Sequence, residues 1–381
     1  MSEVTTSRLS ELVRLASAVG IYKLALVLLA FTAPLLLPGA FNGEAWLGHF
    51  HWPESGSPTP TSSLETWHAQ HYLYLAAEGY GQPRPPIAYF PLFPWLIRWI
   101  SLAPGISFLG AALLVSNLSS LAAVILLFAL LRRAHPGTEW ATLVLLLAFP
   151  GALFFQLPYT EGLFLLLIVA AFWGFELERY ELVAAAGFLA ALTRPVGVAL
   201  CLVIACDLYD RWRWDRRLDG IEVVSMAAPL AGFTFYLINM RIVSGDALAG
   251  LARLPGLVDP GGLVRIPQFF ARLFDMRAIH DFEYSLLDRL AFLLVLATLF
   301  PVWRLDRRFF WFCLPIVLIA PLAGSFTSFT RYAAVLFPIF VVLGGIFTAG
   351  ERRIWLATTA SIFLAIQVVL LVRHATFHWA G

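Results

Sequence analysis

The sequence predicts an all-α polytopic membrane protein, organised as a single integral membrane domain over residues 1–381. Two observations predict this class. Hydrophobic residues make up 60% of the chain, only 13% of residues are charged, and the mean hydropathy is +0.79. Apolar runs of membrane-spanning length also recur from one end of the chain to the other. Lipid is therefore the expected solvent for most of this chain.

Eleven apolar runs are candidate transmembrane helices. They cover residues 21–38, 105–131, 139–156, 161–177, 181–193, 195–208, 221–243, 286–303, 309–324, 332–349 and 354–372. Arg8 and Arg14 precede the first run, which is longer than the core of a signal peptide, so we expect it to be retained as a span. The N-terminus is then expected in the cytoplasm.

Arginine positions predict the orientation of the later runs. With the N-terminus inside, five groups of arginines all fall on the cytoplasmic side, as the positive-inside rule requires. The groups are Arg132 and Arg133; Arg179; Arg211, Arg213, Arg216 and Arg217; Arg304, Arg307 and Arg308; and Arg352 and Arg353. This agreement holds only if the stretch 181–208 forms two helices instead of one.

A break in that stretch is expected at Thr193, Arg194 and Pro195. Proline disfavours helix at the residue before it and cannot continue the backbone ladder, and a buried arginine requires an aqueous or anionic partner. We therefore predict two short helices in a V, with Arg194 near the outer tip. The alternative is one kinked helix whose Arg194 side chain extends to the membrane surface.

Two long extracytoplasmic loops are expected at residues 39–104 and 244–285, with short turns at 157–160 and 325–331 on the same side. The second loop and the residue group just beyond it are rich in arginine. These arginines are Arg253, Arg265, Arg272, Arg277 and Arg289. Their position against the orientation rule favours a bound anion, such as a phosphate group at the lipid surface. Alternatively they are solvated, because long loops translocate regardless of charge.

The first loop contains the most distinctive stretch of the chain, TWHAQHYLYLAAEGY at 66–80, followed by YFPLFP at 89–94. Ser62 and Glu65 have the spacing of a capping box, so we predict a helix start there, and Gly79 predicts its end. The many aromatic rings suit a helix that lies along the membrane surface. The residues on one side of this amphipathic helix are Trp67, His71, Tyr74 and Glu78.

Five sequence blocks follow one another along the chain. They are TWHAQHYLYLAAEGY (66–80), AYFPLFPWLIR (88–98), FPGALFFQLPYTEGLFLL (149–166), ALTRPVG (191–197) and SFTRYAAVLFPIF (328–340). In this order they resemble the PIG-V type mannosyltransferases and their bacterial relatives, which belong to the GT-C class of membrane glycosyltransferases. The resemblance covers most of the chain, and five ordered blocks are far more specific than any single one.

The resemblance implies a GT-C-like bundle of about eleven transmembrane helices with amphipathic helices in the long first loop. It implies transfer of a sugar, most simply mannose, from a polyprenyl-phosphate donor to a lipid, glycan or protein acceptor at the extracytoplasmic face, with inversion at the anomeric centre. Lys23 is the only lysine, and this preference for arginine favours a GC-rich bacterial genome. The expected location is therefore the bacterial inner membrane. Membrane lipids are a further expected partner. No nucleic-acid partner is expected, because the sequence has no nucleic-acid footprint, and the sequence also has no nucleotide-binding glycine loop.

Inverting transfer needs a base for the acceptor hydroxyl and positive charge for the departing phosphate. The resemblance implies an acidic residue directly after the tryptophan of the first block, but that position is His68. Three explanations stay open: His68 is the base, Glu65 or Glu78 has taken the role, or the chain is a catalytically degenerate homologue. Glu65 is otherwise a capping partner, and Glu78 a solvated residue at a helix end.

The predicted outer turns supply the expected substrate-binding residues. Arg194 and Arg331 are the preferred phosphate clamp. Glu161 either belongs to the site or only stabilises the first turn of its helix. The remaining candidates are Tyr332, Tyr159, Trp67, His71 and Tyr89.

No cofactor or metal is expected. His68, His71 and Glu65 form the one grouping with metal-ligand character, and such groups in loops more often only form hydrogen bonds. The three cysteines lie inside apolar runs, without metal spacing and without the pattern of a disulfide framework.

Two other functions compete with the transferase. A transporter or flippase of lipid-linked intermediates would also need broken helices and cations near lipid phosphates, but its polar sites would lie near the membrane midplane. A non-catalytic protein that binds a lipid-linked sugar or another subunit would explain the missing carboxylate after Trp67.

Overall fold

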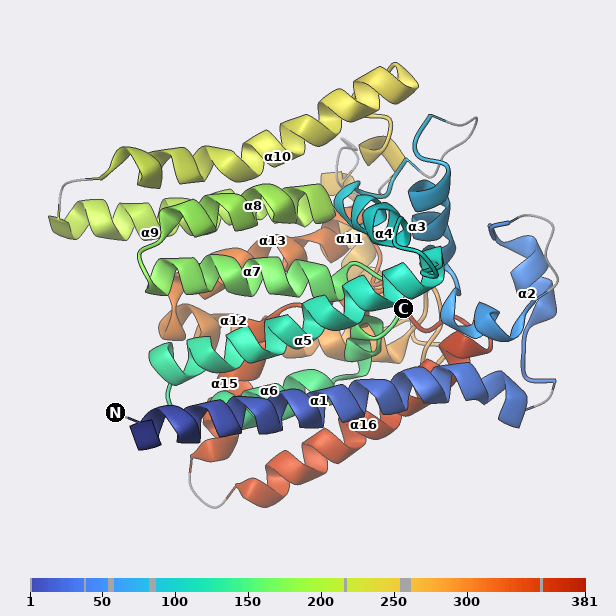
Figure 1. Cartoon of the computed structure of the whole chain (residues 1–381), viewed down its shortest axis with the longest axis horizontal. Helices are drawn as coiled ribbons and strands as arrows, with labels where there is room; N and C mark the ends of the chain where they lie inside the picture. Colours follow the sequence, from blue (N-terminus) through green and yellow to red (C-terminus); the bar gives the residue numbers. More distant parts are fainter. Residues whose placement is uncertain are drawn as a thin grey trace.

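A computed structural model describes residues 2–37, 39–53, 58–81, 87–215, 218–253, 262–349 and 352–381. This part of the chain contains sixteen α-helices and four short 3-10 helices, and no β-strand occurs within it. The predicted all-α class is therefore confirmed for the described residues. Most of the long helices lie side by side along one direction (Figure 1).

The helices have the following bounds. The α-helices are α1 Ser2–Leu36, α2 Gly43–Gly48, α3 His68–Ala77, α4 Leu92–Ser101, α5 Phe108–Ala134, α6 Glu139–Ala148, α7 Glu161–Glu176, α8 Tyr180–Thr193, α9 Leu200–Asp215, α10 Gly220–Ser244, α11 Gly262–Arg272, α12 Leu286–Leu305, α13 Arg307–Ala323, α14 Phe329–Ala334, α15 Phe337–Thr348 and α16 Arg353–Ala375. The 3-10 helices are η1 Pro60–Leu64, η2 Pro150–Phe155, η3 Pro195–Ala199 and η4 Leu251–Arg253.

Five of the described helices are long and apolar enough to cross a membrane: α1 over Ser10–Leu36, α5, α10, α12 and α16. Helices α6, α8 and α15 are apolar but shorter. Each of the eleven predicted runs overlaps at least one helix, so the predicted positions of the apolar helices agree with the structure. The five long helices support the prediction of a helical membrane protein.

Three predicted runs are not continuous helices. In the run 139–156, α6 ends at Ala148 and η2 follows; in 332–349, α14 ends at Ala334 before α15 begins; and in 195–208, η3 precedes α9. A proline lies at the start of one segment in each run. Pro150 begins η2, Pro338 lies in the first turn of α15, and Pro195 begins η3. Proline lacks the amide hydrogen that a helix interior needs, so it begins a new segment instead.

The predicted break at Arg194 is confirmed. Helix α8 ends at Thr193, and Arg194 has extended backbone dihedrals of φ −150° and ψ 147°. The chain then folds back on α8, and the backbone at Gly197 packs closely against that helix. A Cβ atom on Gly197 would lie only 2.2 Å from the backbone oxygen of Ala190. Only glycine permits this approach. One continuous kinked helix, the alternative considered above, is therefore wrong.

The loop helices correct the predicted start of the first-loop helix. Helix α3 begins at His68, with Trp67 at its N-cap, and η1 precedes it. The oxygen Oγ of Ser62 accepts a hydrogen bond from the amide of Thr59 at 2.9 Å, so Ser62 completes the cap of η1 and does not form the predicted box with Glu65. The predicted end is confirmed, because Gly79 follows α3 with φ +75°.

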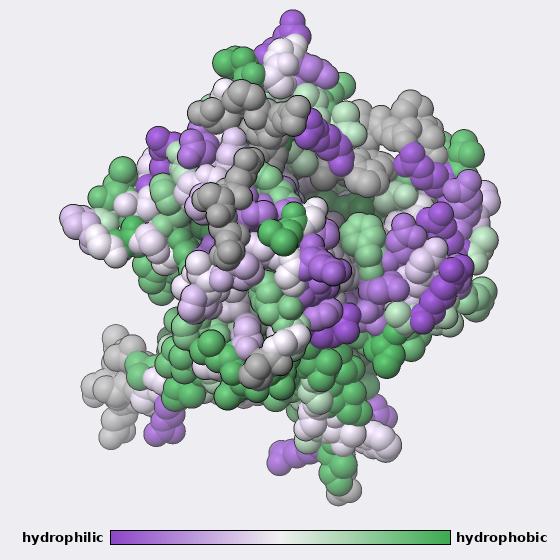
Figure 2. Space-filling model, turned by 90° about the vertical axis from the view of Figure 1, so that its right-hand side faces the viewer, coloured by the Kyte–Doolittle hydropathy of each residue, from purple (hydrophilic) through white to green (hydrophobic). Residues whose placement is uncertain are grey.

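The helix ends divide into two groups. One end of the bundle carries α2, α3, α4 and the C-terminus, and the other carries the N-terminus and the α5–α6 and α7–α8 turns (Figure 1). We call these the loop end and the opposite end. Figure 2 looks onto the loop end, where hydrophilic side chains gather beside hydrophobic patches.

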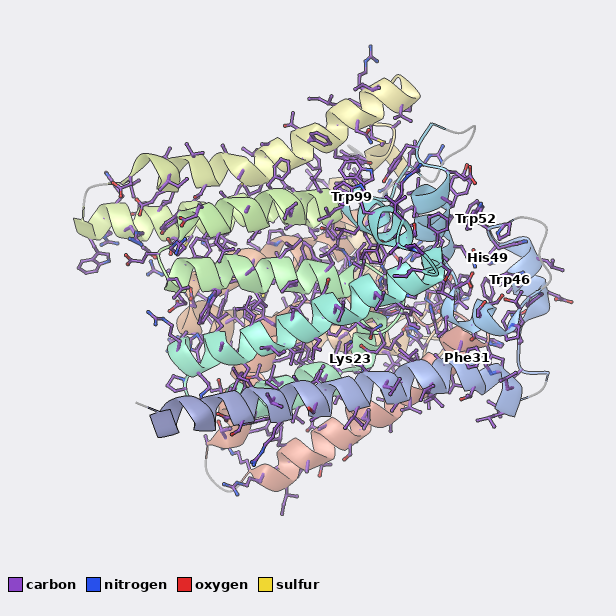
Figure 3. All side chains as sticks on the ribbon, viewed as in Figure 1. Lys23, Phe31, Trp46, His49, Trp52 and Trp99 are labelled. Atoms are coloured by element: carbon purple, nitrogen blue, oxygen red, sulfur yellow. The ribbon has the colours of Figure 1, made fainter. Side chains whose placement is uncertain are left out.

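The single lysine joins two elements inside the bundle. Lys23 projects from the middle of α1 (Figure 3), is only 4% exposed, and donates hydrogen bonds to Oε1 of Gln156 at 2.8 Å and to the carbonyl of Phe155 at 3.0 Å. It therefore satisfies backbone and side-chain acceptors where η2 interrupts the regular helix ladder.

Candidate functional site

A cavity of about 430 Å³ lies where the broken helices meet the first loop. Its polar lining comes from six separate stretches of the chain, and further aromatic and aliphatic side chains complete it. The lining residues are His68, Tyr72, Ala88, Tyr89, Phe90, Thr160, Thr193, Arg194, Pro195, Val196, Arg253, Phe282, Ile316, Ile319, Arg331, Tyr332 and Val335. The breaks at Arg194 and before α15 therefore border one cavity.

The carboxylate of Glu161 joins two of the cavity arginines. Glu161 is the first residue of α7 and is fully buried. Its Oε1 accepts a hydrogen bond from Nη1 of Arg194 at 2.5 Å and another from Nε of Arg331. Its other oxygen, Oε2, is buried and has no hydrogen-bond partner in the described part of the chain. The two guanidinium groups favour the ionised carboxylate.

Arg331 also fixes the protonation of His68. Nη1 of Arg331 lies 2.8 Å from Nδ1 of His68. A guanidinium group can only donate, so Nδ1 must accept, and the hydrogen of the neutral ring is then on Nε2. Burial, and after it the charge of Arg331, lowers the pKa of His68 well below its ordinary value. His68 is therefore neutral and presents an N–H donor.

Aromatic rings surround the two arginines. The guanidinium carbon of Arg331 lies 4.6 Å from the ring centre of Tyr159 and 5.1 Å from that of Phe154. The guanidinium carbon of Arg194 lies 5.4 Å from the ring centre of Tyr332. These contacts hold the charged groups in place without adding further carboxylates.

The predicted site residues fall into three groups. Five of them line the cavity: His68, Arg194, Arg331, Tyr332 and Tyr89. Three others lie behind this lining. Glu161 holds the arginines, Tyr159 donates a hydrogen bond from its hydroxyl to the carbonyl of Thr66 at 3.1 Å, and Trp67 stacks on Phe377 at 4.6 Å. His71 is next to the cavity, stacked between Phe50 and Tyr89 at 4.5 and 4.7 Å.

The two glutamates considered as alternative bases do not line this cavity. Glu65 follows η1, and burial raises the pKa of its carboxyl group. Glu78 is exposed at the C-terminal end of α3, and His68 begins the same helix of ten residues. At a rise of about 1.5 Å per residue, this places Glu78 roughly 15 Å from His68 along the helix axis. The helical spacing of Trp67, His71, Tyr74 and Glu78 therefore places Glu78 on one face of the helix but does not bring it to the cavity of His68.

Most of the second-loop arginines have structural roles. Arg289 donates to the carbonyls of Arg272 and Ser285 at 2.8 Å each, and Arg277 pairs with Asp275 at 2.9 Å. Arg253 is different, because it lines the cavity and its side chain has no hydrogen-bond or ion-pair partner among the described residues. The predicted anion-binding role therefore fits one arginine of this loop.

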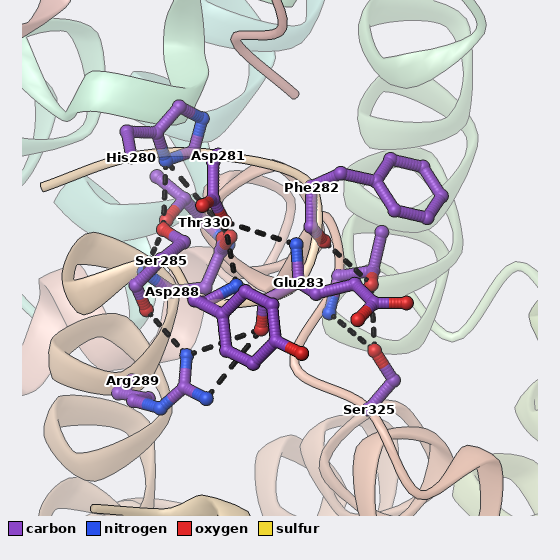
Figure 4. A network of polar contacts seen from close by, with 11 residues as sticks. His280, Asp281, Phe282, Glu283, Ser285, Asp288, Arg289, Ser325 and Thr330 are labelled. Atoms are coloured by element: carbon purple, nitrogen blue, oxygen red, sulfur yellow. Dashed lines mark hydrogen bonds and ion pairs between the residues drawn. The ribbon is translucent and has the colours of Figure 1, made fainter. Parts of the chain in front are cut away.

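A polar network anchors the segment that carries Phe282 (Figure 4). Oγ1 of Thr327 donates to the carbonyl of Phe282 at 2.8 Å, and Oδ1 of Asp288 accepts from the amide of Thr330 at 2.7 Å. Asp288 is fully buried, and His280 lies 3.9 Å from its second oxygen. Since Thr330 precedes Arg331, Asp288 fixes the backbone from which the cavity arginine projects.

Several lining residues were not predicted. Tyr72 and Thr160 are buried side chains of the first and third sequence blocks, and their neighbours in those blocks were the available signal. Phe282 and His374 gave no signal in the sequence. His374 in α16 has Nε2 3.2 Å from the hydroxyl of Tyr159, behind the lining. Its approach depends on packing between segments more than 200 residues apart.

Metal-ligand character is not evident in the described residues, where no three histidine, cysteine, aspartate or glutamate side chains are grouped to hold an ion. The ring centres of His68 and His71 are 6.4 Å apart, and Nδ1 of His68 is already bound by Arg331. The three cysteines are free thiols. Comparisons of the chain with protein-family models, with curated proteins and with solved structures found no match.

Proposed function

We propose that this protein is an inverting membrane glycosyltransferase that moves a sugar, most simply mannose, from a polyprenyl-phosphate donor to a lipid, glycan or protein acceptor. The observation that carries the proposal is the excess of positive charge at the cavity. Among the described residues, three arginines, Arg194, Arg253 and Arg331, are opposed there by one carboxylate, that of Glu161. Guanidinium groups of this kind suit a phosphate, which they bind with paired hydrogen bonds.

The other walls of the cavity suit the remaining parts of such a donor. Tyr72, Tyr89 and Tyr332 offer ring faces and hydroxyl groups against which a sugar can pack. Ile316 and Ile319 of α13 supply an aliphatic wall for the first units of a polyprenyl chain. A cavity of about 430 Å³ is in the range of small-molecule sites.

The proposed reaction exchanges two bonds at the anomeric carbon of the sugar. The acceptor oxygen forms a bond to this carbon, while the bond from the carbon to the phosphate oxygen breaks and its electron pair leaves with the phosphate. Arg194 and Arg331, together with the Nε2–H of His68, would stabilise the negative charge that develops on that phosphate. The acceptor proton passes to a base.

Two acceptor atoms of the site compete for the role of base. Nδ1 of His68 becomes available if Arg331 moves to the donor phosphate, and Oε2 of Glu161 is already without a partner among the described residues. Glu161 is a carboxylate, as the base implied by the resemblance would be, but it lies behind the cavity lining and is fully buried. His68 lines the cavity directly.

We further propose that all eleven predicted runs cross a bacterial inner membrane and that the cavity faces the extracytoplasmic side. Support comes from the arginines. Arg132 lies in the last turn of α5, Arg179 at the N-cap of α8 and Arg308 at the start of α13. Figure 1 shows these helix ends at the opposite end of the bundle. The positive-inside rule would place that end in the cytoplasm.

A second candidate function is a non-catalytic protein that binds a lipid-linked sugar. One observation favours it: no carboxylate is among the described residues that line the cavity, although inverting transfer usually employs one. In this case the arginines would hold the donor phosphate without turnover.

The test uses the full chain in proteoliposomes with radiolabelled polyprenyl-phosphate mannose and membrane extract as the acceptor source. Transfer of label from the lipid donor to acceptor, with release of polyprenyl phosphate, is the expected result. Arg331→Gln should abolish transfer, and Arg179→Gln at the opposite end should not change it. Donor binding without label transfer in any acceptor fraction would refute the transferase and favour the binding protein.

Variants of the two competing bases refine the test. If His68 is the base, His68→Ala abolishes transfer and His68→Asp retains part of it, with a changed pH profile. If Glu161 is the base, both His68 variants retain part of the transfer, because they lose only the Nε2–H donor, while Glu161→Gln binds the donor but does not turn it over. Loss of donor binding in Glu161→Gln would instead show that this carboxylate only positions the arginines.

A further inference from the structure

A second groove, of about 670 Å³, opens at the opposite end of the bundle. It lies between the last turns of α12 and α15 and the turn that joins α5 to α6. Among the described residues, it shares no lining residue with the cavity described above. A ligand bound there would therefore contact none of the described residues that line the proposed transferase site.

The groove combines positive charge with an apolar wall. Arg304 and Arg352 contribute guanidinium groups, and His135 contributes an imidazole ring. Aliphatic side chains of α15 form much of the remaining surface. They are Val341, Val342 and Ile346. This combination matches a molecule that has an anionic head and a hydrocarbon tail.

The two arginines are not neutralised by carboxylates in the described part of the chain. The guanidinium carbon of Arg304 lies 4.7 Å from the ring centre of Phe300, and Nη1 of Arg352 donates to the carbonyl of Ile346 at 3.3 Å. Arg307 and Arg308, which follow Arg304 closely in sequence, both have carboxylate partners. Among the described residues, the two groove arginines therefore lack a carboxylate partner, unlike Arg307 and Arg308.

We propose that this groove binds an anionic phospholipid of the surrounding membrane, with the phosphate between Arg304 and Arg352 and one acyl chain along α15. The lipid is the favoured occupant over a soluble phosphate because the groove borders α12 and α16, two helices long and apolar enough to cross a bilayer. An acyl chain gains free energy from the aliphatic wall, which a soluble anion cannot use.

The test measures lipid retention by the full chain in neutral detergent. Phosphatidylglycerol is titrated into the protein, and bound lipid is counted by native mass spectrometry while the melting temperature is followed. We expect one phosphatidylglycerol to be retained with a rise in melting temperature. We expect phosphatidylcholine to be retained less, and glycerol phosphate, a soluble phosphate anion without acyl chains, to have no effect.

Substitution of the arginines locates the site. Each arginine near a membrane surface contributes about 1 kcal/mol to binding an anionic lipid, so Arg304→Gln with Arg352→Gln should weaken binding about 25-fold. The double variant Arg304→Lys with Arg352→Lys keeps the charge and should retain most of the affinity. The control is the double variant Arg179→Gln with Arg213→Gln. It removes the same formal charge from the same end of the bundle, but at residues that do not line the groove, and should have little effect.

Three results would overturn the proposal. The first is equal retention of phosphatidylglycerol and phosphatidylcholine. The second is an equal loss of affinity in the groove variant and the control variant, which would indicate general surface charge. The third is stabilisation by glycerol phosphate alone, which would indicate a soluble anion. If the glutamine double variant does not fold, the single variants Arg304→Gln and Arg352→Gln are compared with the control instead, and each should weaken binding about fivefold.

Discussion

Two clusters of charged side chains lie at opposite ends of the helix bundle, and they are built in opposite ways. At the cavity, one carboxylate, Glu161, accepts hydrogen bonds from Arg194 and Arg331. At the opposite end, one arginine, Arg308, donates to three carboxylates. These are Asp306 at 2.8 Å, and Asp207 and Glu176 at 3.1 Å each.

The difference separates a structural network from a binding site. Around Arg308, acceptors outnumber the donor and one of them, Asp207, also receives the hydroxyl of Tyr180, so the cluster joins α7, α9 and α13 without spare positive charge. Around Glu161, donors outnumber the acceptor and one carboxylate oxygen has no partner in the described part of the chain. A ligand anion can complete only the second arrangement.

The largest effect is expected from Glu161→Gln. This change leaves two largely buried guanidinium groups without their shared countercharge, and breaking a buried ion pair from one side costs about 3–5 kcal/mol. We expect the free energy of unfolding to fall by this amount, measured by denaturant titration in detergent. Glu181→Gln, which removes the exposed partner of Arg179, is the control and should leave stability nearly unchanged. Equal losses in both variants would contradict the assignment of Glu161 as the centre of the site.

Next in size is Arg308→Gln. Three carboxylates would lose a donor, and because the arginine side chain is 23% exposed we expect a loss of about 1–3 kcal/mol in stability. Binding of polyprenyl phosphate, measured on the folded protein, should stay the same. Arg331→Gln should instead lose that binding. Loss of binding in a well-folded Arg308→Gln protein would break the comparison between the two ends.

The pH dependence of stability tests the buried histidines of the loop end. Burial lowers the pKa of His71 to about 4, below the ordinary value of 6.5. The unfolded chain therefore binds this proton first, so the contribution of His71 is complete above pH 6.5 and is lost as the pH falls toward 4. The loss amounts to roughly 3 kcal/mol at most.

His71→Phe isolates that contribution, because phenylalanine keeps the stack with Phe50 and Tyr89 and does not titrate. We expect the variant to lose less stability than the parent between pH 6.5 and 4. The slope of the free energy of unfolding against pH should correspond to about one proton fewer taken up on unfolding. Identical pH profiles for the two proteins would show that His71 is not buried as a neutral ring.

The smallest effect is expected from Arg253→Gln. Arg253 is exposed at the cavity, so its removal should not change the melting temperature. Affinity for polyprenyl phosphate should fall about fivefold, the loss expected for one arginine near a membrane surface. Arg277→Gln, which removes an exposed arginine already paired with Asp275, is the control. An equal change in both variants would remove Arg253 from the site.

Sequence reasoning succeeded where local chemistry decides the structure. Pro195 and the arginine before it predicted the break between α8 and α9, and Gly79 predicted the end of α3. It failed where a short motif had more than one solution. The spacing of Ser62 and Glu65 fits a capping box, yet Ser62 caps the 3-10 helix with Thr59, and α3 begins later, at His68.

The candidate site was predicted in its parts but not in its connections. Arg194, Arg331 and His68 were identified from sequence blocks, and the structure brings all three to one cavity. Glu65 and Glu78 were considered for the same site because they are close to His68 in sequence, and neither lines the cavity. Sequence distance is a poor guide here, since a helix and a loop direct neighbouring side chains to different surroundings.

By itself the sequence determined which segments are apolar helices and where proline ends them, because these depend on the composition and backbone chemistry of neighbouring residues. Only the tertiary structure decided that Glu161 pairs with arginines 33 and 170 residues away. It also decided that Nδ1 of His68 accepts from Arg331, which leaves the ring hydrogen on Nε2. A buried charge takes the partner that packing brings within hydrogen-bond distance, and packing between distant helices is not written in any local pattern.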